Sequence, residues 1–506
     1  MKNLLEELEK YSVSDYYPFH MPGHKRLPKE GALACYKRLP KEGALACYKR
    51  LPKEGAPACS KDILKKIYPY DITEIEGFDN LHDAGALLLS LQEKAAHVYH
   101  AEQTFFLVNG STGGILSAVS AVAKEGKKIL IARNCHKSVY NAVLLNRLHA
   151  EYLWPDMIEE FDIQGEIRAE EIEKHLYRRQ DICGVVITSP TYDGIVSDIR
   201  EIAKKVHAHH IPLIVDEAHG AHFVLSEKAP ESAVECGADL IVNSVHKTLP
   251  ALTQTALLHV QGTLIDREKL KSYLRIYQSS SPSYLLMASI DECVEFVEKQ
   301  GRERYERMLI LREKIDEEAA RFSCIRILPQ GERRDPGKLV VSVKNTDMTG
   351  WELYHILLQK YHIQMEMAAP SYVLGILTGM DTKEGAERLA GALKKIDKEL
   401  AGKLRRDREI KRSERKDDIY NIIPPASGLS IYEAAQREKE WIYAEESAGR
   451  VSGEMLYFYP PGIPVLVPGE VIPERMVSAV KRCREKEEYL TGITKDGKLC
   501  VLREKF

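Results

Sequence analysis

The chain is 506 residues long and 44% hydrophobic, which is enough for two or three domains, each with its own core. Its 72 basic and 75 acidic residues nearly cancel to a net charge of −3, which argues against a nucleic acid as the main partner. The N-terminus lacks the layout of a signal peptide, no apolar run reaches membrane-spanning length, and the ten cysteines form no CxxC pair. We therefore expect a cytoplasmic protein with reduced thiols, no metal site, and no membrane or nucleic-acid partner.

An N-terminal segment, residues 1–70, contains a tandem repeat. RLPKEGALACYK occupies 26–37, recurs identically at 38–49 and returns as RLPKEGAPACSK at 50–61. A proline and a glycine in every 12 residues prevent one continuous helix, and the period is shorter than that of usual solenoid repeats. The identity of the first two copies indicates either a recent tandem duplication or an artefact of sequence assembly, and we expect the fold to accommodate the repeat as an exposed loop.

Residues 71–285 alternate between short apolar runs and amphipathic stretches of helical length. The runs lie at 127–132, 183–189, 211–217, 238–244 and 255–260, and helical patterns such as 115–126 and 199–210 lie between them. Strands buried on both faces with helical crossovers predict an α/β large domain with a doubly wound, mostly parallel sheet. Ligands bind beyond the carboxyl ends of such strands, so the residues that follow each run are the candidates for chemistry.

The remaining chain predicts two further domains. Long charged helices and shorter strand-like runs at 286–395 indicate a smaller α+β domain. The highly charged stretch 396–418 is typical of a helix end that continues into a solvated linker. Residues 419–506 include YFYPPGIPVLVPGE, whose prolines and glycines impose an irregular path, and we expect a C-terminal domain there.

A single lysine, Lys247, follows the apolar run 238–244 in the stretch SVHKT. A buried lysine costs free energy unless it is paired or deprotonated, and a deprotonated amine attacks carbonyl carbons. A lone lysine more often extends its charge to the surface. The other candidate residues at the predicted strand ends favour a reactive amine over a surface lysine.

Three other features lie at predicted strand ends. Gly110, Ser111 and Thr112 open a helix after FFLV, and a helix N-terminus can hold a phosphate, although Gly-Ser-Thr is also ordinary helix-capping sequence. Asp216 could pair with a protonated ring nitrogen, and His136 could lie over an aromatic ring. Together with Lys247 as a Schiff-base amine, these are the parts of a pyridoxal phosphate site.

With these motifs the sequence resembles the Orn/Lys/Arg decarboxylases, which have the aspartate aminotransferase fold type of pyridoxal phosphate enzymes. The resemblance extends over nearly the whole chain, and its length is similar to the shorter bacterial branch. The stretches that carry it are PFHMPGHKR (18–26), DITEIEGFDNLHD (71–83), FLVNGSTGG (106–114), RNCHKSVYNA (133–142), SPTYDG (189–194), SVHKT (244–248), SSSPSYLLMASID (279–291) and YPPGIPVLVPGE (459–470).

The resemblance implies a role for each matched residue. Lys247 would form the Schiff base, Asp216 would pair with the pyridine nitrogen, and His136 would stack on the ring. Glu366 or Glu454 would recognise the distal cation of the substrate, with an ordinary structural pairing as the alternative. The implied cofactor contacts are Gly110, Ser111, Thr112, His136, Asp216, His219, Ser244, His246 and Lys247, with Ser280 or Ser281 supplied by a second subunit of a homodimer.

The implied reaction is decarboxylation of a basic amino acid to its amine and CO2 in polyamine metabolism, with arginine favoured over lysine or ornithine. An α-oxoamine synthase or aminotransferase-like enzyme of the same fold and a non-catalytic homologue are the alternatives. The letters DEAH at 216–219 also occur in helicases, but no Walker A loop accompanies them. The sequence departs from the family in the tandem repeat, which begins directly after MPGHK.

Overall fold

The computed structural model describes residues 15–23, 25, 67–178, 181–406, 425, 428–485 and 490–503. The tandem repeat at 26–61 lies outside the described residues, so its expected loop stays a prediction. Among the residues that are described, no helix is both long and apolar enough to cross a membrane.

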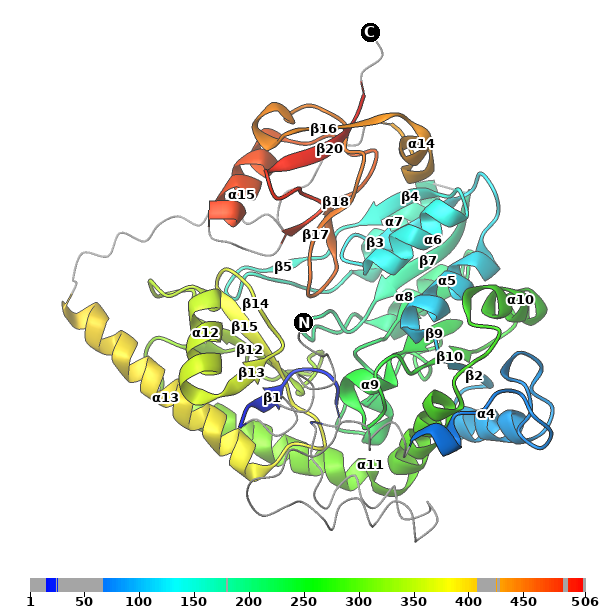
Figure 1. Ribbon diagram of the computed structural model, residues 1–506, viewed down its shortest axis with the longest axis horizontal. Coiled ribbons are helices and arrows are strands. Elements are labelled where there is room, and N and C mark those ends of the chain that lie inside the picture. Colours follow the sequence, from blue (N-terminus) through cyan, green and yellow to red (C-terminus); the bar gives the residue numbers. More distant parts are fainter. Residues whose placement is uncertain are drawn as a thin grey trace.

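The largest sheet has seven strands in the order β2-β10-β9-β8-β7-β3-β4 (Figure 1). Six of them run parallel, and β10 is antiparallel to both neighbours. All five apolar runs predicted as strands form strands of this sheet, which has the expected doubly wound, mostly parallel arrangement. The bounds are β2 Gln103–Leu107, β3 Lys128–Ala132, β4 His149–Leu153, β7 Ile182–Thr188, β8 Leu213–Asp216, β9 Leu240–Asn243 and β10 Ala256–Val260.

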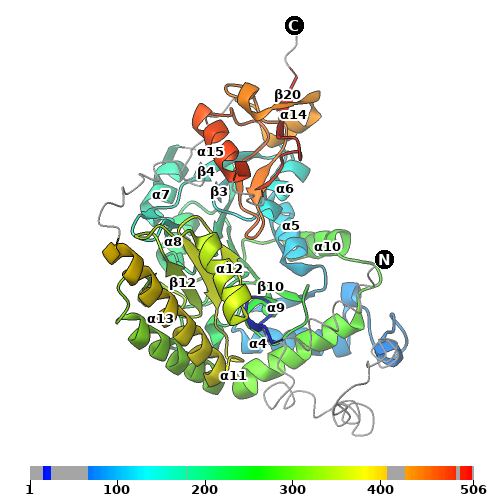
Figure 2. The same cartoon turned by 60° about the vertical axis from the view of Figure 1, so that its left-hand side comes forward.

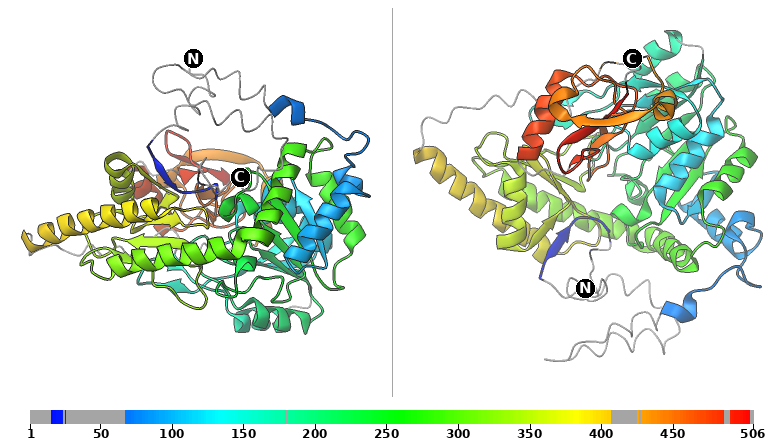
Figure 3. Two further views of the ribbon diagram at one scale, coloured as in Figure 1. Left: turned by 90° about the horizontal axis from the view of Figure 1, so that it is seen from below. Right: turned by 45° about the horizontal axis from the view of Figure 1, so that its top comes forward.

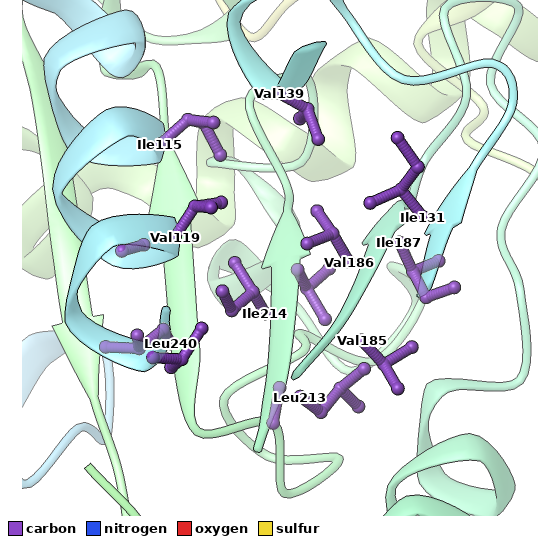
Figure 4. Packing of buried hydrophobic residues seen from close by; sticks show 14 of the residues in the cluster. Ile115, Val119, Ile131, Val139, Val185, Val186, Ile187, Leu213, Ile214 and Leu240 are labelled. Atoms are coloured by element: carbon purple, nitrogen blue, oxygen red, sulfur yellow. The ribbon is translucent and has the colours of Figure 1, made fainter. Parts of the chain in front are cut away.

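Helices cover this sheet and bury its five inner strands almost completely. Figure 4 shows Ile115 and Val119 of one helix, α5, facing Ile214 and Leu240 of the strands, and all four side chains are buried. Because both faces are covered, the strands read as continuous apolar runs rather than alternating ones. The helices connected to this sheet are α5 Gly110–Val122, α6 Lys137–Leu145, α7 Ala169–Arg178, α8 Ile199–His207, α9 Val245–Thr248 and α10 Arg267–Tyr277, and a hairpin of β5 Met157–Ile158 and β6 Ile163–Gln164 lies beside it.

A smaller antiparallel sheet, ordered β11-β12-β15-β14, follows the long helix α11. Figure 2 shows α11 and α13 lying side by side beneath this sheet, and their apolar faces share one core. The first described strand, β1, pairs in parallel with β13. The bounds are β1 Tyr17–Phe19, α4 Leu87–Val98, α11 Tyr284–Ala319, β11 Arg326–Ile327, β12 Lys338–Ser342, α12 Gly350–Tyr361, β13 Ile363–Met365, β14 Met367–Ala368, β15 Tyr372–Ile376 and α13 Lys383–Arg406.

The C-terminal residues form a third body with a core of its own. It lies over the β3-β4 side of the large sheet (Figures 1 and 3), and Ile431 and Val467 join the core of that sheet. Helix α13 takes up the first part of the stretch 396–418 that we expected to be a linker, and residues 407–418 are outside the described chain. The bounds are α14 Ile431–Gln436, β16 Lys439–Tyr443, β17 Leu456–Phe458, β18 Pro464–Leu466, α15 Glu474–Glu485, β19 Leu490–Thr491 and β20 Lys498–Leu502.

Candidate active site

Lys247 lies in the single-turn helix α9, directly after β9. Its amine is 3.1 Å from Nε2 of His219, and the side chain is half-buried. Burial lowers the pKa of Lys247, because water no longer stabilises the ammonium, while the Asp216 and Glu366 carboxylates oppose that shift. The amine is therefore easier to deprotonate than that of a surface lysine, as a nucleophile toward an aldehyde requires.

Asp216 is the last residue of β8 and is only 4% exposed. One carboxylate oxygen accepts a hydrogen bond from the backbone N–H of Ala218 at 3.2 Å. Burial raises the pKa of Asp216, and the positive charge of Lys247 partly offsets this effect. A carboxylate in this position is stabilised when it has a cationic partner, such as a protonated ring nitrogen.

His136 follows β3 and caps the N-terminus of α6. Its Nδ1 accepts a hydrogen bond from the backbone N–H of Ser138 at 3.2 Å. Burial and the charge of Lys247 lower the pKa of His136 to about 3, so the ring is neutral. A neutral, half-buried imidazole at the carboxyl ends of the strands is suited to stack on a flat ligand.

The proposed phosphate cup combines a helix N-terminus with a buried hydroxyl. Gly110 begins α5 with φ of +70° and donates its N–H to the carbonyl of Gln254, at the end of the loop before β10. The Ser244 hydroxyl is fully buried and has no hydrogen-bond partner in the described part of the chain. Because an unpaired buried hydroxyl is costly, it fits an acceptor such as a phosphate oxygen.

The other residues of the cup differ in exposure. Ser111 is half-buried, and Thr112 is exposed at the start of α5. Nδ1 of His246 lies 2.8 Å from the carbonyl oxygen of Thr255, and burial lowers the pKa of His246 to about 4. These residues therefore offer neutral groups and open first-turn N–H groups, which suit an anion.

The N-terminal motif PFHMPGHK packs against the lysine loop. Gly23 donates its N–H to the carbonyl of His246 at 2.8 Å, and a Cβ on Gly23 would come within 2.7 Å of the backbone of Leu249. Met21 donates its N–H to Glu366 at 2.9 Å. Lys25 is fully buried and lies 3.7 Å from Asp381. Only a residue without a side chain permits this approach at Gly23.

The residues expected to bind the substrate or to come from a second subunit differ in whether they lie near Lys247. Glu366 joins the cluster around Lys247 and accepts a hydrogen bond from the Tyr192 hydroxyl. Glu454 is exposed in the C-terminal body and pairs with Lys439 at 3.0 Å. Ser280 and Ser281 are exposed between α10 and α11. Within one chain the structure brings Glu366, but not Glu454 or either serine, to the lysine.

Comparison with known proteins identifies the relatives of this arrangement. Residues 58–392 match the family model of the Orn/Lys/Arg decarboxylase major domain, and residues 424–497 match that of the C-terminal domain. The chain belongs to the Orn/Lys/Arg decarboxylase family. The predicted family and enzyme class, decarboxylation of basic amino acids, are thereby confirmed. Because the second match is to the decarboxylase family's own C-terminal domain, it also speaks against the α-oxoamine synthase alternative.

Individual members of this family resemble the chain over most of its length. It is 31% identical to the arginine decarboxylase of Bacillus subtilis over 418 residues, which is 81% of this chain and 84% of that protein. It is 25% identical to the constitutive lysine decarboxylase of Escherichia coli over 470 residues, 76% of this chain and 66% of that protein. The lysine decarboxylase LdcF of Francisella novicida superposes with a TM-score of 0.73 at 20% identity, covering 98% and 80%, which confirms the fold.

The family's C-terminal domain contacts the candidate site in this chain. Gly462 accepts a hydrogen bond from the backbone N–H of Lys137 at 3.0 Å, and a Cβ on Gly462 would lie 3.1 Å from Nε2 of His136. Gly462 also has φ of +83°, which side chains other than glycine rarely adopt. The Lys137 amine lies 4.7 Å from the centre of the Tyr457 ring. The loop 459–462 therefore packs directly on the imidazole that we expect to stack.

Sequence reasoning missed a second lysine beside His219. Lys338 begins β12 of the smaller sheet, is 2% exposed, and places its amine 2.9 Å from Nδ1 of His219. It also donates a hydrogen bond to the carbonyl of Tyr192 at 3.0 Å. The sequence does contain a signal for Lys338, because this lysine directly precedes the apolar run LVVSV. Lys247 was singled out for the same reason, as a lysine next to an apolar run.

Proposed function

We propose that the chain is a pyridoxal phosphate-dependent decarboxylase whose preferred substrate is arginine. The observation that carries the cofactor is the convergence of Lys247, Asp216 and His136 at the carboxyl ends of β9, β8 and β3 of one sheet, next to the unpaired hydroxyl of Ser244. The preference for arginine is supported by the higher identity and coverage of the arginine decarboxylase relative than of the lysine decarboxylase relative.

The chain's own residues would bind and orient the cofactor. Lys247 would hold it covalently, and the first turn of α5 together with Ser244 would hold its phosphate. His136, backed by the loop 459–462, would stack on the cofactor ring and exclude water from that face. When bound, the cofactor supplies a conjugated ring that accepts the electron pair released as the bond from Cα to the carboxylate breaks. Asp216 would hold a proton on the ring nitrogen and so favour that acceptance.

Glu366 is the residue we propose for the distal cation of the substrate. It lies close enough to Lys247 to influence the pKa of that amine, and Tyr192 orients it by a hydrogen bond. An arginine side chain presents a planar fork of donors, which a fixed carboxylate accepts well. We propose that Glu454, an exposed partner of Lys439, does not contact the substrate of its own chain.

We also propose a cytoplasmic homodimer that acts in polyamine metabolism. Large apolar side chains are exposed on the segment that precedes α4, including Tyr68, Ile75 and Phe78. The loop between α10 and α11, which carries Ser280 and Ser281, lies against the same segment, because Nε2 of His82 is 2.7 Å from the carbonyl oxygen of Ser279. A second subunit seated there would be in position to exchange Ser280 and Ser281 between active sites.

Product identification tests the proposed reaction. Purified protein supplied with pyridoxal phosphate is incubated separately with arginine, lysine and ornithine, and the amines are identified by mass spectrometry. We expect agmatine to form fastest. Faster formation of cadaverine or putrescine would refute the preference for arginine, and the absence of all three amines would refute the decarboxylase.

Borohydride reduction should locate the cofactor on Lys247. The loaded protein should show a visible absorption band that borohydride abolishes, because reduction of the C=N double bond to a single bond ends its conjugation with the ring. Peptide mapping should then place the adduct on Lys247. Lys338 is the informative internal control, since its amine lies on the other side of the same histidine; an adduct there would show that the assignment is wrong.

A further inference from the structure

His219 lies between two lysine amines. Its Nε2 is 3.1 Å from the Lys247 amine, and its Nδ1 is 2.9 Å from the Lys338 amine. The ring is 5% exposed and packs edge-on against Tyr192, with 4.8 Å between the ring centres. The histidine is thus fixed in place and connects a residue of the large sheet to one of the smaller sheet.

The two contacts constrain where protons reside. Burial holds the pKa of His219 well below its usual range, so the ring is neutral. A neutral imidazole has one N–H donor and one acceptor nitrogen. An ammonium has no lone pair and can only donate. If both contacts are hydrogen bonds, the lysine at the ring N–H is a neutral amine that accepts from it, and the other lysine donates to the second ring nitrogen as an ammonium or an amine.

The surroundings identify Lys338 as the ammonium. Its amine donates to the Tyr192 carbonyl and lies 5.2 Å from the centre of the Tyr192 ring. Burial lowers the pKa of Lys338 to about 8, and the Asp335, Glu366 and Asp193 carboxylates oppose that shift, so most of this amine is still protonated at neutral pH. Within the described chain, the Lys247 amine has His219 as its single hydrogen-bond partner.

Other charged and titratable groups face Lys247 from the elements around it. Asp216 at the end of β8 and Glu366 from the smaller domain favour a positive charge on this amine. His136 and His246 are neutral, because burial lowers the pKa of each. Lys338 opposes a second positive charge, since the two lysines repel through the buried histidine. Whether the Lys247 amine is charged or neutral therefore depends on Lys338.

We propose that Lys338 is a positioning residue that acts through His219. As a fixed ammonium it donates to Nδ1, which holds the imidazole proton on Nε2, and the N–H on Nε2 then leaves Lys247 as a neutral amine ready to bond to the cofactor. The smaller domain thereby sets the protonation of a residue on the large sheet. This inference rests on the proposed role of Lys247 as the cofactor lysine.

Competitive acetylation of the full-length, cofactor-free protein tests the order of titration. Trace acetic anhydride is applied over a range of pH, and mass spectrometry measures the acetylated fraction of the peptides that carry Lys247 and Lys338. The midpoint of each profile reports when that amine loses its proton, independently of its accessibility. We expect Lys247 to titrate at lower pH than Lys338. The reverse order would overturn the proposal without any substitution.

Variants then test the cause. Lys338→Met removes the charge and frees the tautomer of His219, so the Lys247 midpoint should rise by about one pH unit, which means about tenfold slower acetylation at a given lower pH. Lys338→Arg keeps a cation and should leave the midpoint near that of the parent. Lys344→Met is the matched control, because Lys344 follows the same strand but pairs with Asp162.

The outcomes separate this proposal from the proposed function. An unchanged Lys247 midpoint in Lys338→Met, or an equal shift in Lys338→Arg or Lys344→Met, would overturn the positioning role. If Lys338→Met fails to fold, the order of titration in the parent protein decides. A borohydride adduct on another lysine would refute the cofactor assignment while leaving these midpoints unaffected, since they are measured without cofactor.

Discussion

Asp216→Asn is expected to bind the cofactor and to lower kcat by about a hundredfold or more. Asparagine has nearly the same shape, and its amide oxygen can still accept the N–H of Ala218, which Asp216 accepts at 3.2 Å. A neutral amide no longer favours a proton on the ring nitrogen, so the ring accepts electrons less readily. The measurement is kcat at saturating cofactor, together with the visible band that shows the cofactor is bound.

Asp239→Asn is the matched control for this substitution. Asp239 is also buried, but it precedes β9 and so lies at the opposite edge of the sheet, where it accepts the N–H of Leu213 at 2.8 Å and contacts His207. We expect Asp239→Asn to lower thermal stability and to leave kcat nearly unchanged. Near-normal kcat in Asp216→Asn, or an equal loss in Asp239→Asn, would contradict the electron-accepting role.

The large sheet was predictable because its strands are buried on both faces. Five continuous apolar runs form strands; the candidate residue Asp216 ends one of these strands, and Lys247 follows another. The direction of β10 was not predictable. Its run, TALLHV, is as apolar as that of a parallel strand, and its reversal depends on pairing with β2 and β9 rather than on its own composition.

The site was predictable only where it is built from strand ends of a single sheet. Lys338 enters from the amino end of a strand in the smaller sheet, 91 positions after Lys247 in the numbering, so no local spacing relates the two lysines. Their meeting point, His219, was expected to bind the cofactor, and its second contact depends on how the two sheets pack. Tertiary packing of this kind leaves no periodic signal in the sequence.

Two glutamates of the C-terminal body also show that the sequence does not reveal which side chains tertiary packing will bury. Glu454 and Glu470 both lie near the YFYPPGIPVLVPGE stretch, and sequence reasoning singled out Glu454. Glu454 is exposed beside Lys439, whereas Glu470 is 5% exposed and lies 3.1 Å from the buried guanidinium of Arg133. Burial decides which of two similar carboxylates matters, and burial here is set by the docking of the C-terminal body on β3.

Glu470→Gln is expected to weaken that docking by about 3 to 5 kcal/mol, because it leaves the Arg133 cation buried without a counter-charge. Arg133 also donates a hydrogen bond to the carbonyl of Pro464, two residues after Gly462. Loss of the ion pair between Glu470 and Arg133 should therefore loosen the segment that carries Gly462. Contact between Gly462 and His136 would then be lost, and activity should fall together with stability. The measurements are the melting temperature and the rate of limited proteolysis between residues 428 and 485.

Glu454→Gln is the matched control, because it makes the same chemical change in the same body at an exposed ion pair with Lys439. Exposed pairs contribute up to about 1 kcal/mol, so stability and proteolysis should remain close to those of the parent. A parent-like melting temperature and proteolysis rate for Glu470→Gln would show that the buried pair does not hold the C-terminal body. A raised KM in Glu454→Gln at unchanged stability would instead return Glu454 to the substrate site, since a purely structural surface pair leaves KM unaffected.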